Sequence, residues 1–136
     1  MTEFFQTGGC QCGHVRYALT KRPEVIYCCH CTECQKQSSS AFGISVRVDA
    51  SALSITGDYA DFERASPNGA TTCEYCPTCG SRLFHRRKSY ADKLNIKGGA
   101  FDDTSWIKPA GHIWTSSKQV WVDLPKGDIT YEAQPE

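Results

Sequence analysis

The nine cysteines of this 136-residue chain constrain its fold more than any other feature, because they fall into three tight groups. The groups are Cys10-Gln11-Cys12, the segment from Cys28 to Cys34, and the segment from Cys73 to Cys79. An odd number excludes a monomer whose cysteines are all paired in disulfides. The first residues lack the basic and apolar regions of a secretory signal, so we expect a cytoplasmic protein with reduced thiols. Metal binding is therefore the leading interpretation of the cysteines.

The first and third groups have the spacing of a closed zinc site. Cys76 and Cys79 are two residues apart on one expected tight turn, and Gly80 is free to take the positive φ that such turns often need. Cys10 and Cys12 supply the other two sulfurs. Structural zinc prefers four tetrahedral ligands, so these four cysteines are predicted to hold a structural zinc ion. The alternative is a set of buried free thiols.

The middle group offers three thiolates within six residues, Cys29, Cys31 and Cys34. Three protein ligands and one vacant position are typical of a catalytic zinc. The alternative is a second closed site that takes its fourth ligand from another residue. The candidates for that ligand are Cys28, His30 and Cys73. We expect the two cysteines to be core residues or spare thiols, and His30 to point away from its cysteine neighbours in an extended segment.

Alternating apolar residues predict a β-rich domain with many short strands. The alternation covers the segments 14–19, 43–48, 53–55, 83–85, 94–96 and 120–122, and residues 25–27 are expected to form a further strand. One short helix is expected, capped by Thr32, with Gln35 completing a capping box and the helix ending towards Gln37. Turns are expected at Pro23, Asn68-Gly69, Gly98-Gly99 and Lys126-Gly127-Asp128.

Charge and length narrow the classes of function. Lys and Arg number 15 and so do Asp and Glu, which argues against binding a polyanion by bulk electrostatics. No segment approaches the roughly 18 apolar residues of a membrane span. We find neither a linker nor a repeat, and a chain of this length suits one domain. We therefore expect a single zinc-binding domain over residues 1–136, with neither nucleic acid nor membrane as a partner.

The ordered motifs of this chain resemble the glutathione-dependent formaldehyde-activating enzyme family over about residues 8–127. The motifs are Gly9-Cys10-Gln11-Cys12-Gly13, Cys29-His30-Cys31-Thr32-Glu33-Cys34-Gln35-Lys36, Ser40-Ala41-Phe42-Gly43, Cys76-Pro77-Thr78-Cys79-Gly80-Ser81, and the tail His112-Ile113, Trp121 and Asp123-Leu124-Pro125. The resemblance implies an all-β or β-rich fold of the β-tent type and two zinc ions. It assigns Cys10, Cys12, Cys76 and Cys79 to a structural zinc, and Cys29, Cys31 and Cys34 to a catalytic one.

The same resemblance implies a carbon–sulfur lyase. The founding activity of that family is the condensation of formaldehyde with glutathione to give S-hydroxymethylglutathione. A small thiol such as glutathione is therefore the expected partner. Three positions differ from the usual pattern, with Gln35 where Arg is common, Ser39 where Gly is common, and Cys73 where a basic residue is frequent. These differences leave the expected zinc ligands intact. They bear on the substrate pocket, because the loop after Cys34 would border the open zinc.

The remaining polar residues leave several hypotheses open. His112 and His85 are candidates for acid–base chemistry, although each has a structural role as the simpler interpretation. The segment 82–97 holds six basic residues against one acidic residue, which predicts either a solvated strand face or contacts with the two carboxylates of glutathione. The alternatives to an enzyme are a structural zinc domain and a nucleic-acid-binding zinc module that uses Arg86, Arg87 and Lys88.

Overall fold

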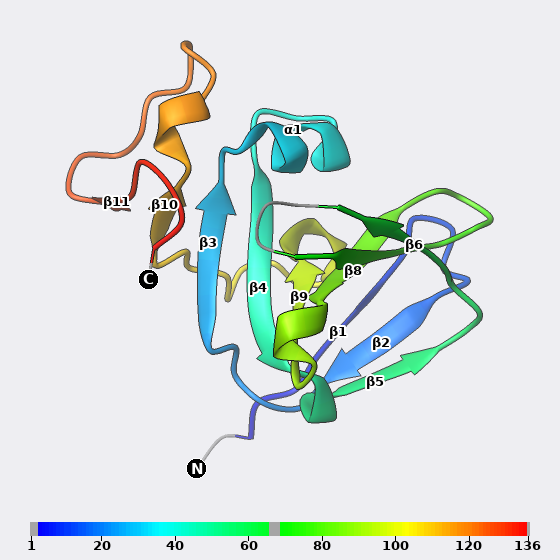
Figure 1. The fold of residues 1–136 in the computed structure, drawn as a ribbon. Helices are drawn as coiled ribbons and strands as arrows, with labels where there is room; N and C mark the ends of the chain where they lie inside the picture. Colours follow the sequence, from blue (N-terminus) through cyan, green and yellow to red (C-terminus); the bar gives the residue numbers. More distant parts are fainter. Residues whose placement is uncertain (1–2, 66–68, 136) are drawn as a thin grey trace.

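The computed structural model describes residues 3–65 and 69–135, and two β-sheets dominate this part of the chain (Figure 1). The smaller sheet is antiparallel, in the order β1-β2-β5, with strands β1 Gln6–Gly9, β2 Arg16–Leu19 and β5 Leu53–Thr56. The larger sheet has the order β11-β10-β3-β4-β9-β8-β7-β6. Its strands are β3 Val25–Cys29, β4 Gly43–Asp49, β6 Ala60–Arg64, β7 Thr71–Tyr75, β8 Arg82–Arg87, β9 Lys93–Lys97, β10 Gly111–Ile113 and β11 Ile129–Thr130.

Helical structure is sparse in the described residues. The single α-helix is α1 Thr32–Ser38, which follows β3 directly and lies over the end of the larger sheet (Figure 1). Single 3₁₀ turns connect several strands, namely η1 Ala50–Ala52, η2 Lys88–Tyr90, η3 Gly98–Ala100 and η4 Thr115–Ser117. The prediction of a β-rich domain with one short α-helix is therefore confirmed.

The core forms where one face of the larger sheet packs against the smaller sheet. Ile26, Val46, Ile96 and Phe84 pair across four neighbouring strands, and all four are buried. The ring centroid of Phe84 lies 5.4 Å from that of Tyr17 in the smaller sheet. Burying each such side chain stabilises the fold by about 1.5–3 kcal/mol. Because side chains alternate across a strand, the other face of the larger sheet carries the residues between these positions.

The strand predictions hold for six of the seven expected strands, which become β2, β3, β4, β5, β8 and β9. The prediction for Val120 and Val122 is wrong. Only Val122 is buried there, Val120 is 95% exposed, and the N–H of Val122 bonds to the carbonyl of Gln119 instead of to a neighbouring strand. Strands β1, β6, β7, β10 and β11 were not predicted, because their short segments lack a clear alternation of apolar and polar residues.

The predicted turns fall where the structure changes direction. Residues Gly98 and Gly99 begin η3, and Gly127 adopts a φ of 90° in the connection to β11. Pro23 lies between β2 and β3. Asn68 of the Asn68-Gly69 prediction lies outside the described residues. No helix in residues 3–65 and 69–135 has the length and apolarity needed to cross a membrane.

Candidate metal centres and the adjoining cavity

Two groups of cysteine sulfurs converge in the structure. Within each group the sulfur atoms lie within 4.8 Å of one another. The four-cysteine cluster comprises Cys10, Cys12, Cys76 and Cys79, and the three-cysteine cluster comprises Cys29, Cys31 and Cys34. All nine cysteines are free thiols.

The four-cysteine cluster joins two turns that are distant in sequence. One turn follows β1 and ends at Gly13, with a φ of 82°, and the other follows β7 and ends at Gly80, with a φ of 80°. Both glycines adopt the left-handed conformation that other residues disfavour. The positive φ expected at Gly80 is thus present, and Gly13 has the same role in the first turn.

The sulfur separations in this cluster fit a tetrahedral metal ion. Cys10 Sγ and Cys12 Sγ are 3.6 Å apart, and Cys12 Sγ and Cys76 Sγ are 3.7 Å apart. Four sulfurs at about 2.3 Å from a tetrahedral zinc would be separated by about 3.8 Å. A disulfide would instead bring two sulfurs to about 2.0 Å. The residues present therefore fit a four-coordinate zinc ion.

Hydrogen-bond donors around Cys10 and Cys79 favour the thiolate form of these two residues, because they lower the pKa of each. The backbone N–H of Val15 donates to Cys10 Sγ at 3.2 Å, and Cys79 Sγ lies 3.2 Å from the hydroxyl of Ser81. The Ser81 hydroxyl, followed by the backbone N–H groups of Ser81 and Cys12, lowers the pKa of Cys79 to about 5. Because thiolates are the form that binds metal, this environment suits a metal site.

The three-cysteine cluster is built where β3 passes into α1. Cys29 is the last residue of β3, and Cys34 lies in the first turns of the helix. The prediction that Thr32 caps the helix is wrong by one residue. Cys31 is the N-cap, with a φ of −65° and a ψ of 154°, and its sulfur accepts a hydrogen bond from the N–H of Cys34 at 3.2 Å. The cap is thus a sulfur of the cluster itself, in the place that an oxygen usually takes.

The environment of Cys31 favours its thiolate. Hydrogen bonds from the thiols of Cys29 and Cys34 come first, and the backbone N–H groups of Cys34 and Glu33 add to them. Together they lower the pKa of Cys31 to about 2 although the residue is half-buried. Within the described residues, no further His, Cys, Asp or Glu joins the cluster. Three cysteine sulfurs without a fourth protein ligand fit a metal ion that keeps one position for substrate.

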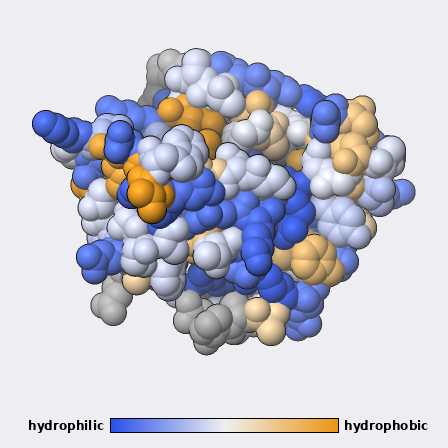
Figure 2. Space-filling view, turned by 90° about the horizontal axis from the view of Figure 1, so that it is seen from above, coloured by the Kyte–Doolittle hydropathy of each residue, from blue (hydrophilic) through white to orange (hydrophobic). Residues whose placement is uncertain are grey.

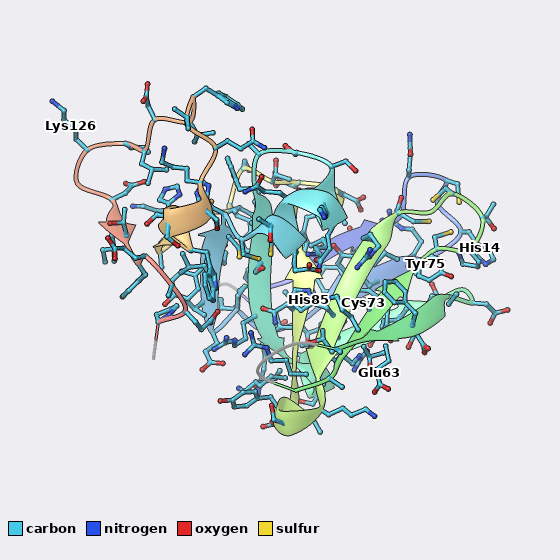
Figure 3. The ribbon with its side chains drawn as sticks, turned by 45° about the horizontal axis from the view of Figure 1, so that its top comes forward. His14, Glu63, Cys73, Tyr75, His85 and Lys126 are labelled. Atoms are coloured by element: carbon cyan, nitrogen blue, oxygen red, sulfur yellow. The ribbon has the colours of Figure 1, made fainter. Side chains whose placement is uncertain are left out.

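The three residues considered as a fourth ligand lie elsewhere. Cys28 is buried beside His112, its neighbour across the β3–β10 pair. His30 is fully buried, and its Nε2 lies 3.2 Å from Nδ1 of His112. Cys73 is buried on β7 and pairs with His85 on β8, next to which it lies in Figure 3.

A cavity of about 710 Å³, here called the thiol cavity, opens beside the three-cysteine cluster. One wall is the face of the larger sheet that points away from the core. This wall carries alternate residues of six neighbouring strands, namely Val25, Tyr27 and Cys29 of β3, Ser45 and Arg47 of β4, Lys93 and Asn95 of β9, His85 and Arg87 of β8, Thr71 of β7 and Arg64 of β6. The lining also includes the α1 residues Glu33 and Gln37, the aromatic residues Tyr90 and Trp114, and the acidic residues Glu24 and Asp92.

The cavity wall is rich in cations that the sequence pattern revealed only in part. Arg87 and Lys93 come from the predicted basic segment, whereas Arg47 and Arg64 do not. No ion pair is found for Arg47 or Arg87 among the described residues, while Arg64 lies 3.5 Å from Glu33 and Lys93 pairs with Asp49 and Glu24. The sequence missed Arg47 and Arg64 because they lie far from the basic segment and meet it only through strand pairing.

Other cations of the predicted basic segment are engaged elsewhere. Arg86 forms a 2.6 Å ion pair with the buried carboxylate of Glu74. Arg82 lies over the ring of Phe62, 4.9 Å from its centroid. The Nζ of Lys97 donates a hydrogen bond to Gln37 on α1, and Gln37 lines both the thiol cavity and a second cavity of about 740 Å³.

The two histidines considered for acid–base chemistry occupy different places. His85 lies on the floor of the thiol cavity, and its Nδ1 is buried without a hydrogen-bond partner among the described residues. Burial, and then the nearby cations led by Lys97 and Arg64, lower the pKa of His85 well below its usual range. His112 does not line the cavity; its Nε2 lies 2.9 Å from Oδ2 of Asp128.

The positions that differ from the family pattern have distinct surroundings. Gln35 ties α1 to a later segment, because its Nε2 donates to the carbonyls of His30 at 2.8 Å and Ser117 at 2.9 Å. Ser39 ends α1 in the left-handed conformation, with a φ of 50°, and lines the second cavity. Neither residue lines the thiol cavity.

Comparison with known proteins identifies a family and a protein of similar fold. A family model described as glutathione-dependent formaldehyde-activating enzyme matches residues 5–117. This range contains both cysteine clusters but ends before Trp121. A Rhodobacter sphaeroides protein of known crystal structure is similar in fold, with a TM-score of 0.53 and 16% identity over 92% of this chain and 98% of that chain. No curated protein matches this chain.

Proposed function

Since this chain belongs to the glutathione-dependent formaldehyde-activating enzyme family, we propose that it is a zinc-dependent carbon–sulfur lyase acting on glutathione or a related thiol adduct. The observation that carries this proposal is the position of the three-cysteine cluster. Its sulfurs converge beside a cavity whose wall presents Arg47 and Arg87. A soft-metal site beside several cations suits a substrate that has both a thiol and carboxylates.

The proposal gives the two clusters different tasks. The four-cysteine cluster would hold a structural zinc, supported by its four-sulfur geometry and by the burial of Cys10 and Cys76 in the core. The three-cysteine cluster would hold the catalytic zinc. When bound there, zinc supplies a Lewis acid that favours the thiolate form of a substrate sulfur. Both ions are part of the proposal.

The described residues would orient the substrate for this reaction. Arg47 and Arg87 would bind its carboxylates, because guanidinium groups form charge-assisted, often bidentate hydrogen bonds with them. In the proposed reaction a C–S bond forms between the glutathione sulfur and the formaldehyde carbon. The thiol proton is balanced by protonation of the aldehyde oxygen, which becomes the hydroxyl of S-hydroxymethylglutathione. The reverse reaction breaks the same C–S bond.

The proposed activity belongs to one domain and one compartment of the cell. We place it in one zinc-binding domain formed by residues 1–136, and in the cytoplasm, where thiols remain reduced. A nucleic-acid-binding module finds less support. Of the three basic residues considered for it, Arg86 pairs with Glu74 and Arg87 lines the thiol cavity, while Lys88 pairs with Glu63. These cations therefore do not form one continuous exposed patch.

The test is an assay of the zinc-loaded protein with glutathione and ¹³C-formaldehyde. NMR exchange measurements should show faster formation of S-hydroxymethylglutathione than in buffer, and a parallel screen should follow breakdown of glutathione conjugates. Cys31→Ser is the control, since it removes one sulfur of the three-cysteine cluster. Protein that carries two zinc ions but accelerates neither formation nor breakdown of any adduct would exclude this function.

A further inference from the structure

Three side chains from separate segments form a hydrogen-bonded chain behind the three-cysteine cluster. His30 lies between Cys29 and Cys31 and is fully buried. Its Nε2 lies 3.2 Å from Nδ1 of His112 on β10, and Nε2 of His112 lies 2.9 Å from Oδ2 of Asp128. The chain thus runs from the cluster to a carboxylate that is 40% exposed.

The ring nitrogens that carry protons in this hydrogen-bonded series can be assigned from the Asp128 carboxylate at its end. The Asp128 carboxylate is an acceptor, so the Nε2 of His112 carries a proton and donates it. Nδ1 of a neutral His112 is then an acceptor, and the Nε2 of His30 is the donor to it. This leaves Nδ1 of His30 as an unprotonated acceptor, for which no partner is found among the described residues. Each imidazole ring therefore has one tautomer that completes the hydrogen bond to the next residue.

The backbone of His30 is held by the same region of the chain. Its N–H donates to the carbonyl of Ile113 at 2.9 Å. Its carbonyl accepts from Gln35 Nε2 at 2.8 Å and from the hydroxyl of Ser117 at 3.0 Å. Ile113 also packs on Cys29 and Cys34, so β10 and the segment that follows it both contact the loop that bears the cluster.

We propose that His112 and Asp128 are positioning residues for the three-cysteine cluster. Neighbouring residues of an extended segment point to opposite sides, so fixing the His30 ring on one side fixes the Cys29 sulfur on the other, where it lines the thiol cavity. This inference rests on the proposed function, because it concerns the metal that the cluster would hold. Outer groups that orient the ligands of a metal commonly change its affinity by about 10–100-fold when they are lost.

The experiment measures zinc affinity at each cluster by competition with a chromophoric chelator, and Co²⁺ serves as a spectroscopic probe of both. Asp128→Ala and His112→Phe should weaken metal binding at the three-cysteine cluster by about 10–100-fold, with no change at the four-cysteine cluster. Asp128→Asn should retain most of the affinity, because its amide oxygen can still accept from His112. Asp123→Asn is the matched control, since it removes an exposed carboxylate from the same segment.

A second measurement needs no metal. The ¹⁵N shifts of the imidazole nitrogens should show His30 and His112 in the Nε2–H form, and Asp128→Ala should shift the His112 signals.

Unchanged affinity in Asp128→Ala and His112→Phe would overturn the positioning role, as would equal weakening at both clusters or an Nδ1–H form of His112. In those cases the proposed function would stand if wild-type protein binds two metal ions and is active. A wild-type protein that binds one ion only would overturn the proposed function, and this inference with it.

Discussion

Arg64 of β6 and Glu33 of α1 form an ion pair of 3.5 Å that connects two walls of the thiol cavity. Arg64 lies on the edge strand of the larger sheet, and Glu33 lies between Cys31 and Cys34. The pair thus links the far edge of the sheet to the helix that bears a sulfur of the three-cysteine cluster. Because Glu33 is half-exposed, the pair contributes only about 0–1 kcal/mol, and a substrate carboxylate can replace Glu33 at small cost.

Opposite changes in substrate binding are therefore expected at these two positions. Glu33→Gln removes a carboxylate that competes for Arg64, so KM for glutathione should fall by about two- to fivefold at low salt. Arg64→Gln removes a cation and should raise KM. Steady-state kinetics at two salt concentrations provide the measurement. If the pair only braces the cavity, both variants should change KM in the same direction.

The cations of the sheet wall are expected to control KM more than kcat. Arg87→Gln and Arg47→Gln should each raise KM for glutathione by roughly tenfold or more, because a hydrogen bond to a charged group contributes about 1.5–3 kcal/mol. Arg22→Gln is the control, since Arg22 is exposed and lies over the ring of Phe4 instead of in the cavity. Equal KM values in all three variants would contradict this role of the sheet wall.

The two clusters should respond differently to the loss of one sulfur. Cys76 is fully buried in the core, so Cys76→Ser should unfold the domain through loss of a structural zinc, whose binding contributes on the order of 10 kcal/mol in small zinc peptides. Cys31→Ser should abolish activity while folding is retained. Circular dichroism, metal content and activity test both variants. Unfolding of both to the same extent would remove the catalytic assignment of the three-cysteine cluster.

Ser39 offers a test of the end of α1. A non-glycine residue in the left-handed conformation is strained, by roughly 1–2 kcal/mol, although glycine also loses more entropy on folding. Ser39→Gly should therefore stabilise the protein by about 0.5–1 kcal/mol, or roughly 2–4 °C in Tm. Ser40→Gly is the matched control, because Ser40 is exposed and has no positive φ, and it should be neutral or destabilising. The Tm values of the two variants, measured by thermal unfolding, test this prediction.

His85 should make stability depend on pH. Its pKa in the folded protein is held well below the usual value, first by burial, whereas a histidine of the unfolded chain titrates near pH 6.5. Below about pH 6.5 the unfolded state therefore takes up a proton that the folded state does not, and stability falls as pH falls. Between pH 7.5 and 5.5 the Tm of His85→Asn should therefore fall by less than the Tm of the wild-type protein. His14→Asn, at an exposed position far from His85 (Figure 3), should follow wild type.

The cysteine spacing anticipated how the sulfurs group, since a separation of one or two residues brings sulfurs together on a single turn. The convergence of Cys10 and Cys12 with Cys76 and Cys79 in space agrees with that expectation; their role as zinc ligands remains a prediction. The N-cap was missed by one residue because sulfur is a poor acceptor, and an oxygen at Thr32 was the better candidate from sequence alone.

Long-range strand pairing is the part that the sequence did not reveal. The short β10 lacks an apolar alternation, and its parallel pairing with β3 depends on a connection that no local pattern describes. The contact of His30 with His112 follows from that pairing. The same holds for the sheet wall, where Arg47, Arg64 and Arg87 meet only because β4, β6 and β8 contribute to one face.

Viewed from the end that bears α1, the molecule is mostly hydrophilic, with its apolar residues in separate groups (Figure 2). The exposed Val120 and Trp121 lie in the segment that follows η4, and Lys126 extends from the outer loop of the C-terminal region (Figure 3).

The parallel pairing of β10 with β3 sets an order for events during synthesis. The four-cysteine cluster has all its sulfurs once Cys79 has left the ribosome. The loop with Cys29 and Cys31 emerges earlier than the groups that hold it, which are Ile113, Ser117 and the His112–Asp128 pair. The nascent chain therefore exposes three unanchored thiols until Asp128 has emerged. During that interval their protection from oxidation depends on reducing surroundings.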